Sequence, residues 1–197
     1  MKTIYFVRHG DKVIDIGNVG LTEVGKKQAE NTANFFKKKS IDYLLSSPYK
    51  RTAETANIIS SNIHIPVIFD ERLKERMFFG EIPNINYQQY ISLCAKSSIH
   101  RDYILPNGVS SYLVGKRVTE LVDEIINSNH TNIVIVSHLG TIADYIRNIF
   151  SKRILREQQP EFVKTFDLKL ASITAIAYTN LNARILTLGS TLHLDKF

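Results

Sequence analysis

Short apolar stretches that alternate with helical patterns restrict this chain to a small number of folds. The apolar stretches are rich in β-branched residues and cover residues 3–7, 43–45, 66–69 and 132–136. Each is followed by loop residues and then by a segment with helical periodicity. Parallel strands need long crossover connections that helices usually provide, so this alternation predicts a largely parallel sheet.

The helical patterns cover residues 22–38, 50–61, 87–96, 110–129 and 140–151. In the fourth of these, an apolar stripe is predicted to pack on the core, and it consists of Leu113, Arg117, Val118, Leu121, Val122, Ile125 and Ile126. Near the end of the chain, residues 172–179 and 184–188 flank Asn180-Leu181-Asn182, which predicts an antiparallel hairpin. Residues 152–168 show no clear element.

Helices on both faces of such a sheet predict a three-layer α/β/α sandwich with a mostly parallel central sheet and an antiparallel C-terminal hairpin. With 197 residues, the chain is long enough for one substantial core, so we expect a single domain over residues 1–197. Arg8 interrupts the first apolar run too early for a signal peptide or a membrane span, which predicts a cytoplasmic protein. The single cysteine, Cys94, excludes an internal disulfide.

The net charge of +6 favours anionic partners, which include phosphorylated metabolites, nucleic acid and acidic membrane surfaces. The densest basic runs, Lys26-Lys27 and Lys37-Lys38-Lys39, lie on or just after a predicted helix, where a solvated helix face explains them. No recognised nucleic-acid module accompanies them. We therefore expect a small phosphorylated partner, and neither nucleic acid nor a membrane.

Two histidines follow two of the predicted strands. Arg8-His9-Gly10 ends the first strand, and Ser137-His138 ends the fourth. Arg51 lies in the first turn of the helix that follows the second strand. Because the carboxyl ends of parallel strands share one edge of a sheet, these side chains are predicted to meet there.

This mixture of side chains suits phosphoryl transfer, which needs an in-line nucleophile and cationic donors around the phosphoryl oxygens. The imidazole of His9 can act as the nucleophile, and the planar fork of Arg51 can bind the oxygens. Gly10 is expected to let the backbone approach the phosphate. Glu75 is the predicted acid that protonates the leaving alcohol.

Five sequence blocks carry a resemblance to a known family, and they read Arg8-His9-Gly10, Leu21-Thr22-Glu23-x-Gly25-x-x-Gln28-Ala29, Ser47-Pro48-x-x-Arg51-Thr52-x-x-Thr55-Ala56, Leu73-x-Glu75-Arg76 and Val136-Ser137-His138-x-Gly140-Thr141-Ile142. In this order they resemble the histidine phosphatase superfamily, and specifically its phosphoglycerate-mutase-like branch. The resemblance extends from about residue 3 to 149, and residues 172–194 are compatible with the closing strands of that family.

The resemblance implies that His9 receives the phosphoryl group while Arg8 and Arg51 bind its oxygens. It also implies that His138 stabilises the developing charge, and that Glu75 serves first as proton donor and then as base. No metal or cofactor is implied, and inorganic phosphate is the expected product. Two histidines beside two arginines would in any case make a poor metal site, since the arginines repel a cation.

The chain departs from the family pattern at three places. Residues 11–20 lack the usual Glu-Thr-x-x-Asn continuation, so one phosphate-contacting position is unassigned. Val109 stands where relatives usually carry an acidic residue. Leu139 replaces a frequent small residue after the second histidine and is expected at the floor of the phosphate pocket, which it either narrows or only repacks.

Three functions stay open at this stage. The first is a phosphatase for small phosphomonoesters, the second a phosphoglycerate mutase, and the third a catalytically weakened relative that binds phosphorylated ligands. Tyr87, Tyr90 and Tyr103 could form a substrate lid or could pack on the core or surface. The oligomeric state is open as well, and a homodimer is one of the alternatives.

Overall fold

A computed structural model describes residues 1–179 and 182–195. Its strands are β1 (Lys2–Arg8), β2 (Tyr43–Ser46), β3 (Val67–Phe69), β4 (Asn132–Ser137), β5 (Ile173–Tyr178) and β6 (Ala183–Ser190). In the described part of the chain these strands form one sheet in the order β3-β2-β4-β1-β5-β6. The first four strands pair in parallel, whereas β5 runs antiparallel to β1 and β6 antiparallel to β5.

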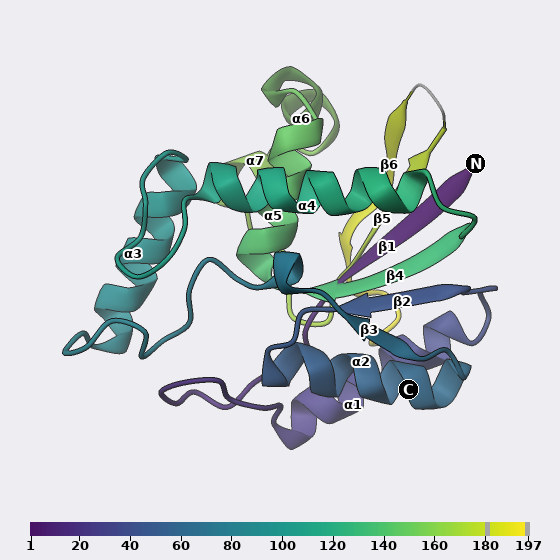
Figure 1. Cartoon of the computed structure of the whole chain (residues 1–197), viewed down its shortest axis with the longest axis horizontal. Coiled ribbons are helices and arrows are strands. Elements are labelled where there is room, and N and C mark those ends of the chain that lie inside the picture. The colour runs from purple at the N-terminus through teal and green to yellow at the C-terminus, as the bar shows by residue number, and fades with distance from the viewer. Residues whose placement is uncertain (180–181, 196–197) are drawn as a thin grey trace.

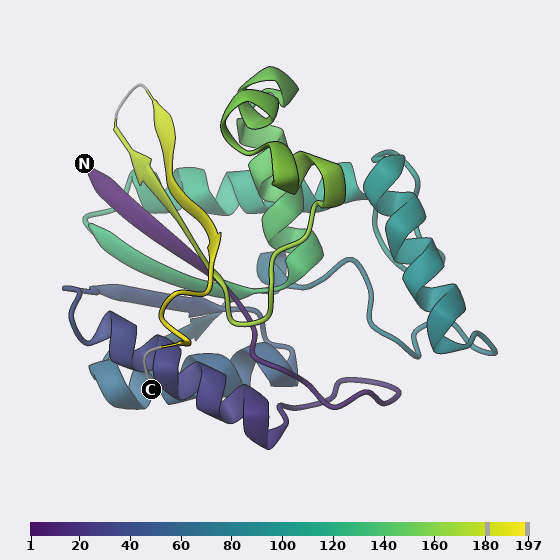
Figure 2. The same cartoon turned by 180° about the vertical axis from the view of Figure 1, so that it is seen from behind.

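The α-helices are α1 (Glu23–Phe36), α2 (Lys50–Ile63), α3 (Tyr87–Ile99), α4 (Ser111–Ile126), α5 (Leu139–Ile149), α6 (Lys152–Gln158) and α7 (Pro160–Thr165). Helices α1 and α2 cover one face of the sheet, and α4 and α5 cover the other (Figures 1 and 2). Helix α3 stands to one side, joined to the rest of the fold by two extended segments (Figure 1). The predicted fold class is confirmed.

Alternation along the central strands creates two hydrophobic cores. On β1, Ile4 and Phe6 pack in the core beneath α4 and α5, while Val7 packs in the core beneath α1 and α2. Strand β4 repeats this pattern, with Ile133 and Val134 on opposite faces. Successive side chains of a strand point to opposite faces, so both strands are apolar throughout because helices cover both sides.

Local signals set the ends of the helices. The hydroxyl groups of Thr22 and Ser110 accept hydrogen bonds from backbone N–H groups at the starts of α1 and α4. Helix α2 ends at His64, whose backbone is left-handed with φ 60°. Strand β3 begins only after Pro66, which has no N–H to donate to the sheet.

Three features differ from the predictions or lie beyond them. Residues 152–168, which showed no clear element, contain α6 and α7. Leu113 was predicted to face the core and is 46% exposed, because the first turn of α4 extends past the sheet toward α3 (Figure 1). Strands β5 and β6 match the predicted hairpin, but Asn180 and Leu181 of its turn lie outside the described residues.

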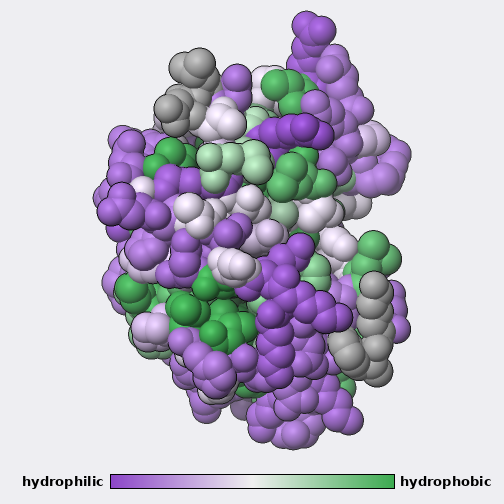
Figure 3. All heavy atoms as spheres, turned by 90° about the vertical axis from the view of Figure 1, so that its right-hand side faces the viewer, coloured by the Kyte–Doolittle hydropathy of each residue, from purple (hydrophilic) through white to green (hydrophobic). Residues whose placement is uncertain are grey.

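The end of the sheet that carries the amino termini of the parallel strands is mostly hydrophilic at its surface. Figure 3 shows this face, on which hydrophobic residues gather in small groups between polar ones. None of the described helices is long and apolar enough to cross a membrane.

Candidate active site

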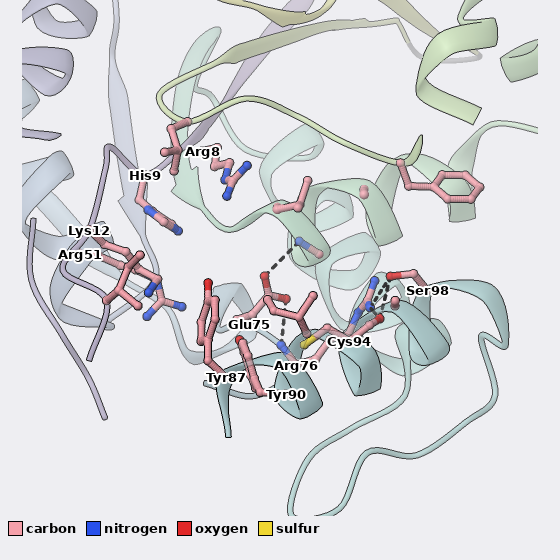
Figure 4. Close-up of a pocket in the computed structure, with 18 of the residues that line it drawn as sticks. Arg8, His9, Lys12, Arg51, Glu75, Arg76, Tyr87, Tyr90, Cys94 and Ser98 are labelled. Carbon is pink, nitrogen blue, oxygen red and sulfur yellow. Dashed lines mark hydrogen bonds between the residues drawn. The ribbon is translucent and has the colours of Figure 1, made fainter. Parts of the chain in front are cut away.

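The two histidines that follow β1 and β4 lie side by side. Because Arg8 pairs with Ser137 in the parallel register, the residues after them emerge at the same edge, and the backbone N–H of His9 donates to the carbonyl oxygen of Ser137 at 3.0 Å. The ring centroids of His9 and His138 are 5.4 Å apart. This edge opens into a cavity of about 450 Å³ (Figure 4).

His9 has a defined tautomer. Its Nδ1 lies 2.8 Å from the carbonyl oxygen of Gly10, and since a carbonyl only accepts, Nδ1 carries the proton and Nε2 has the free lone pair. Burial lowers the pKa of His9 well below its ordinary value, and the positive charges of Arg51 and Arg8 lower it further. The imidazole is therefore neutral near pH 7, which is the form that can attack an electrophile.

Arg51 is a buried cation without a counterion. It is 4% exposed, and no ion pair or side-chain hydrogen bond to it is found among the described residues. Its guanidinium carbon lies 5.2 Å from the centre of the Tyr49 ring, and its distal end points into the cavity (Figure 4). Burying a charge without a partner is costly, so this arrangement favours binding of an anion.

Arg8 reaches the same cavity from the end of β1. One of its terminal nitrogens donates to the carbonyl oxygen of Leu168 and lies 3.7 Å from the carboxylate of Asp167. Its Nε is buried without a hydrogen-bond partner among the described residues. These contacts hold one end of the Arg8 guanidinium in place and leave its other N–H groups available to a ligand.

His138 is fully buried and is not among the residues that line the cavity. Its Nε2 is 2.9 Å from the hydroxyl oxygen of Ser47, while its Nδ1 has no hydrogen-bond partner among the described residues. Burial lowers the pKa of His138 well below its ordinary value, and the positive charge of Arg51 lowers it further. The ring is consequently neutral and carries one N–H donor.

Glu75 is held at the amino terminus of α5, on the cavity wall. Its carboxylate accepts hydrogen bonds from the backbone N–H groups of Gly140 and Arg76, each at 3.0 Å. The hydroxyl of Thr141 also donates to it, at 3.4 Å. A side chain at Gly140 would come within 2.4 Å of this carboxylate. The first turn of α5 therefore fixes the position of Glu75.

Leu139 lines the cavity as expected, but Gly10 does not. A Cβ at Gly10 would lie 2.5 Å from the carbonyl oxygen of Gly25 in α1. The backbone of α1 therefore occupies the side of Gly10 on which a Cβ would lie. That the Gly10 backbone contacts phosphate stays a prediction.

Lys12 is a cavity residue that the sequence analysis did not identify. It projects beside Arg51 and His9 (Figure 4). Burial lowers the pKa of Lys12, and the charge of Arg51 lowers it further. Backbone hydrogen bonds between Val13 and Gly20 and between Thr22 and Asp11 hold this loop against α1. The available signal was that Lys12 is the sole basic residue in the loop 11–20.

The remaining predictions concern a tyrosine lid over the cavity, the acidic residue that Val109 replaces, and the absence of a metal site. Tyr87 and Tyr90 line the cavity, whereas Tyr103 and Val109 do not. In the part of the chain that the structure describes, no cluster of three or more His, Cys, Asp or Glu side chains could hold a metal ion.

The comparison with protein families supports the same assignment. The family model described as histidine phosphatase superfamily, branch 1, matches residues 4–191, which is nearly the whole chain. The chain belongs to the histidine phosphatase superfamily. Its phosphoglycerate-mutase-like fold and its resemblance to that branch are thereby confirmed.

Several relatives within this superfamily are named by their activities. A Hydrogenobacter thermophilus protein, provisionally named as a phosphoserine phosphatase, is 32% identical over 156 residues, which cover 72% of this chain and 75% of that protein. A Proteus mirabilis protein, provisionally named as a phosphoglycerate mutase, is 28% identical over 200 residues, which cover 91% of this chain and 86% of that protein.

A crystal structure of a third relative shares the fold along the entire chain. It is phosphoserine phosphatase from Entamoeba histolytica in complex with 3-phosphoglyceric acid. The two chains are 26% identical, the TM-score is 0.75, and the match covers 98% of this chain and 100% of the other.

Proposed function

We propose that this chain is a phosphatase that hydrolyses phosphomonoesters of small metabolites through a phosphohistidine on His9. The observation that carries the proposal is Arg51, a buried guanidinium that has no counterion among the described residues and points into the cavity beside a neutral imidazole. A phosphate dianion would supply the missing negative charge. Phosphatase relatives within the same superfamily support this assignment.

In the first step, Arg8, Arg51 and Lys12 would bind the phosphoryl oxygens, and Nε2 of His9 would attack phosphorus. The N–P bond forms as the ester P–O bond breaks, and protonated Glu75 gives its proton to the departing alkoxide. Nδ1 of His9 keeps its proton and its hydrogen bond to Gly10, which stabilises the positive charge that the ring acquires.

In the second step, a water molecule would attack the phosphohistidine. Glu75, now ionised, accepts a proton from the water as the new P–O bond forms and the N–P bond breaks. If the hydroxyl of Ser47 donates to Nε2 of His138, the proton of that ring lies on the unpartnered Nδ1, which is then free to donate to a phosphoryl oxygen. Inorganic phosphate leaves, and His9 returns to its neutral form.

We propose that the reaction needs no metal ion. Three cations from Arg8, Lys12 and Arg51 already surround the site, and they would repel a divalent metal while neutralising the phosphate themselves. A cytoplasmic location, a single domain and a homodimer stay predictions.

The test is phosphate release from a panel of phosphomonoesters in the presence of a metal chelator. His9→Ala should abolish activity, whereas His100→Ala, a change at an exposed histidine away from the cavity, should not. Quenched reactions should show an acid-labile phosphoryl adduct in the wild type and in His100→Ala but not in His9→Ala. Equal turnover by wild type and His9→Ala would overturn the mechanism.

A mutase is the second candidate, and the Proteus mirabilis relative favours it. A coupled assay that detects conversion of 3-phosphoglycerate to 2-phosphoglycerate distinguishes the two, since a phosphatase releases phosphate and does not isomerise. Tight phosphate binding without turnover of any ester would instead indicate the catalytically weakened relative.

A further inference from the structure

The cavity extends beyond the phosphate-binding side chains into a second part, which we name the apolar chamber. Its wall comes mainly from α3, from α5 and from the residue after α7, and its apolar part includes Tyr87, Tyr90, Ile91, Leu139, Ala143 and Phe166. Polar side chains of Arg76 and Ser98 complete this wall. Figure 4 shows Tyr87 and Tyr90 projecting from α3 toward the centre of the cavity. The leaving alcohol of a bound phosphomonoester would lie in this chamber.

Among the described residues, Arg76 is the cation that lines the chamber, and its charge is already paired. Arg76 is buried and paired with Asp144, with nitrogen to oxygen distances of 2.7 and 2.8 Å. Its remaining terminal nitrogen donates to the hydroxyl oxygen of Ser98 at 2.8 Å and to the carbonyl oxygen of Cys94 at 3.2 Å. Four of the five N–H donors of Arg76 are thus used within the protein, and its charge is paired with that of Asp144.

The carboxylate of Glu75 lies at the boundary between the phosphate-binding side chains and the chamber (Figure 4). Because Glu75 is protonated when it acts as the acid, it supplies no charge there, and a substrate carboxylate placed in the chamber would lose its hydration without gaining a cation. The chamber thus disfavours a charged alcohol portion by desolvation.

Aromatic packing gives the chamber a suitable surface for an apolar group. Phe79 contacts Tyr87 and Tyr90 with ring centroids 5.4 and 5.7 Å apart, and this cluster supports the start of α3. Tyr87 and Ile91 are 38% and 40% exposed, so apolar surface is available to a ligand. Covering such surface is favourable because it is removed from water.

We infer that the preferred substrates are phosphomonoesters of uncharged, apolar alcohols, aromatic or aliphatic, rather than of carboxylate-bearing alcohols such as phosphoserine and 3-phosphoglycerate. The inference rests on the proposed function and assigns its substrate class. This substrate class differs from phosphoserine, the substrate that the names of two relatives give.

The test compares kcat/KM for esters of primary alcohols, which keeps the leaving-group chemistry similar. The substrates are 2-phenylethyl phosphate, hexyl phosphate, ethyl phosphate, phosphoserine and 3-phosphoglycerate. We expect the two apolar esters to exceed both carboxylated ones by about tenfold or more, given the transfer free energy of an apolar side chain. Ethyl phosphate, with neither group, should fall between them. A preference for phosphoserine or 3-phosphoglycerate over the apolar esters would overturn the inference.

A matched pair of variants on α3 tests whether the chamber causes the preference. Ile91→Lys places a cation in the chamber wall and should lower kcat/KM for 2-phenylethyl phosphate while raising it for 3-phosphoglycerate. Ile99→Lys, on the same helix, is outside the wall and 70% exposed, and should change neither. Equal effects of the two variants would contradict the assignment of the chamber.

Ethyl phosphate separates failure of this inference from failure of the proposed function. Its hydrolysis depends on His9 and hardly on the chamber, so His9-dependent turnover of ethyl phosphate with a preference for carboxylated esters would reject the substrate class alone. If His9→Ala hydrolyses every ester as fast as the wild type, the proposed function fails, and the inference fails with it.

Discussion

At the scale of single residues, the site is a group of positive charges maintained at a cost to stability. Arg51 is buried with no counterion among the described residues, and the charges around His9 depress its pKa. Such an arrangement is typical of functional sites, where side chains are placed for a ligand rather than for the ligand-free fold.

Arg51→Met should therefore stabilise the ligand-free protein by about 1 to 4 kcal/mol, because an unpaired buried charge is removed while the length of the side chain is nearly kept. Phosphate at a hundred times its dissociation constant should stabilise the wild type by about 2.7 kcal/mol and the variant hardly at all. Denaturant unfolding with and without phosphate measures both effects. A destabilised variant that still responds to phosphate would contradict this prediction.

The pKa of His9 should appear in the pH dependence of the reaction. Neutral His9 is the active form, and its pKa lies below about 6.5, so the loss of kcat/KM on the acid side should occur below that pH once the ionisation of the substrate is taken into account. Arg51→Met removes one positive charge, so the pKa of His9 should rise in that variant. Nuclear magnetic resonance of labelled histidine, assigned with His9→Ala, measures it directly. An unchanged pKa would refute the electrostatic explanation.

Lys12→Ala should reduce kcat/KM by about tenfold to a hundredfold, the effect of losing a hydrogen bond to a charged group. The reduction should be similar for apolar and carboxylated esters if Lys12 binds the phosphoryl group. A loss confined to carboxylated esters would instead assign Lys12 to a substrate carboxylate. Lys50→Ala, at an exposed position beside Arg51 in the sequence, is the control.

At the scale of elements, the amino terminus of α5 orders the acid–base residue. The backbone N–H of Gly140 and the hydroxyl of Thr141 bind the carboxylate of Glu75. The conformation of this turn, rather than the chemistry of Glu75 alone, decides where a proton is delivered.

Gly140→Ala should lower kcat about tenfold or more and leave the melting temperature nearly unchanged. The new Cβ would lie 2.4 Å from Glu75, and because a flexible side chain moves more easily than a backbone, the carboxylate would be displaced instead of the helix. Steady-state kinetics and thermal unfolding provide the two measurements. A large loss of stability with unchanged kcat would show that the helix had moved instead.

At the scale of the whole molecule, one buried ion pair links the parts of the fold that surround the site. Arg76 binds Asp144 on α5 and donates to residues of α3, and the hydroxyl of Ser111 in α4 also donates to Asp144. This network connects the apolar chamber to the helices that cover the sheet.

Asp144→Ala should destabilise the protein by about 3 to 5 kcal/mol, because it leaves the buried charge of Arg76 without a partner. Glu157→Ala removes an exposed pair with Arg153 and should cost no more than about 1 kcal/mol. Urea unfolding of both variants makes the comparison. Equal losses in the free energy of unfolding would show that the buried ion pair stabilises the protein no more than the exposed one.

Much of this architecture could be predicted from the chain alone. Periodicity identified four parallel strands, five helices and the closing hairpin, because apolar spacing follows the geometry of each element. Chain order also placed Arg8, His9 and His138 at the strand ends that meet, and Arg51 in the first turn of the helix after the second strand. Residues 152–168 escaped prediction because two short helices carry too few periodic residues to be recognised.

The sequence by itself thus determined the layers of the fold and the edge at which the histidines and arginines gather, since both follow from local periodicity and chain order. Only the tertiary structure decided that Arg51 lacks a counterion within the described part of the chain, that Gly10 faces α1, that Lys12 enters the cavity and that α3 supplies an apolar wall. These properties depend on where side chains from distant segments point. No local pattern encodes that, because it results from the packing of the whole chain.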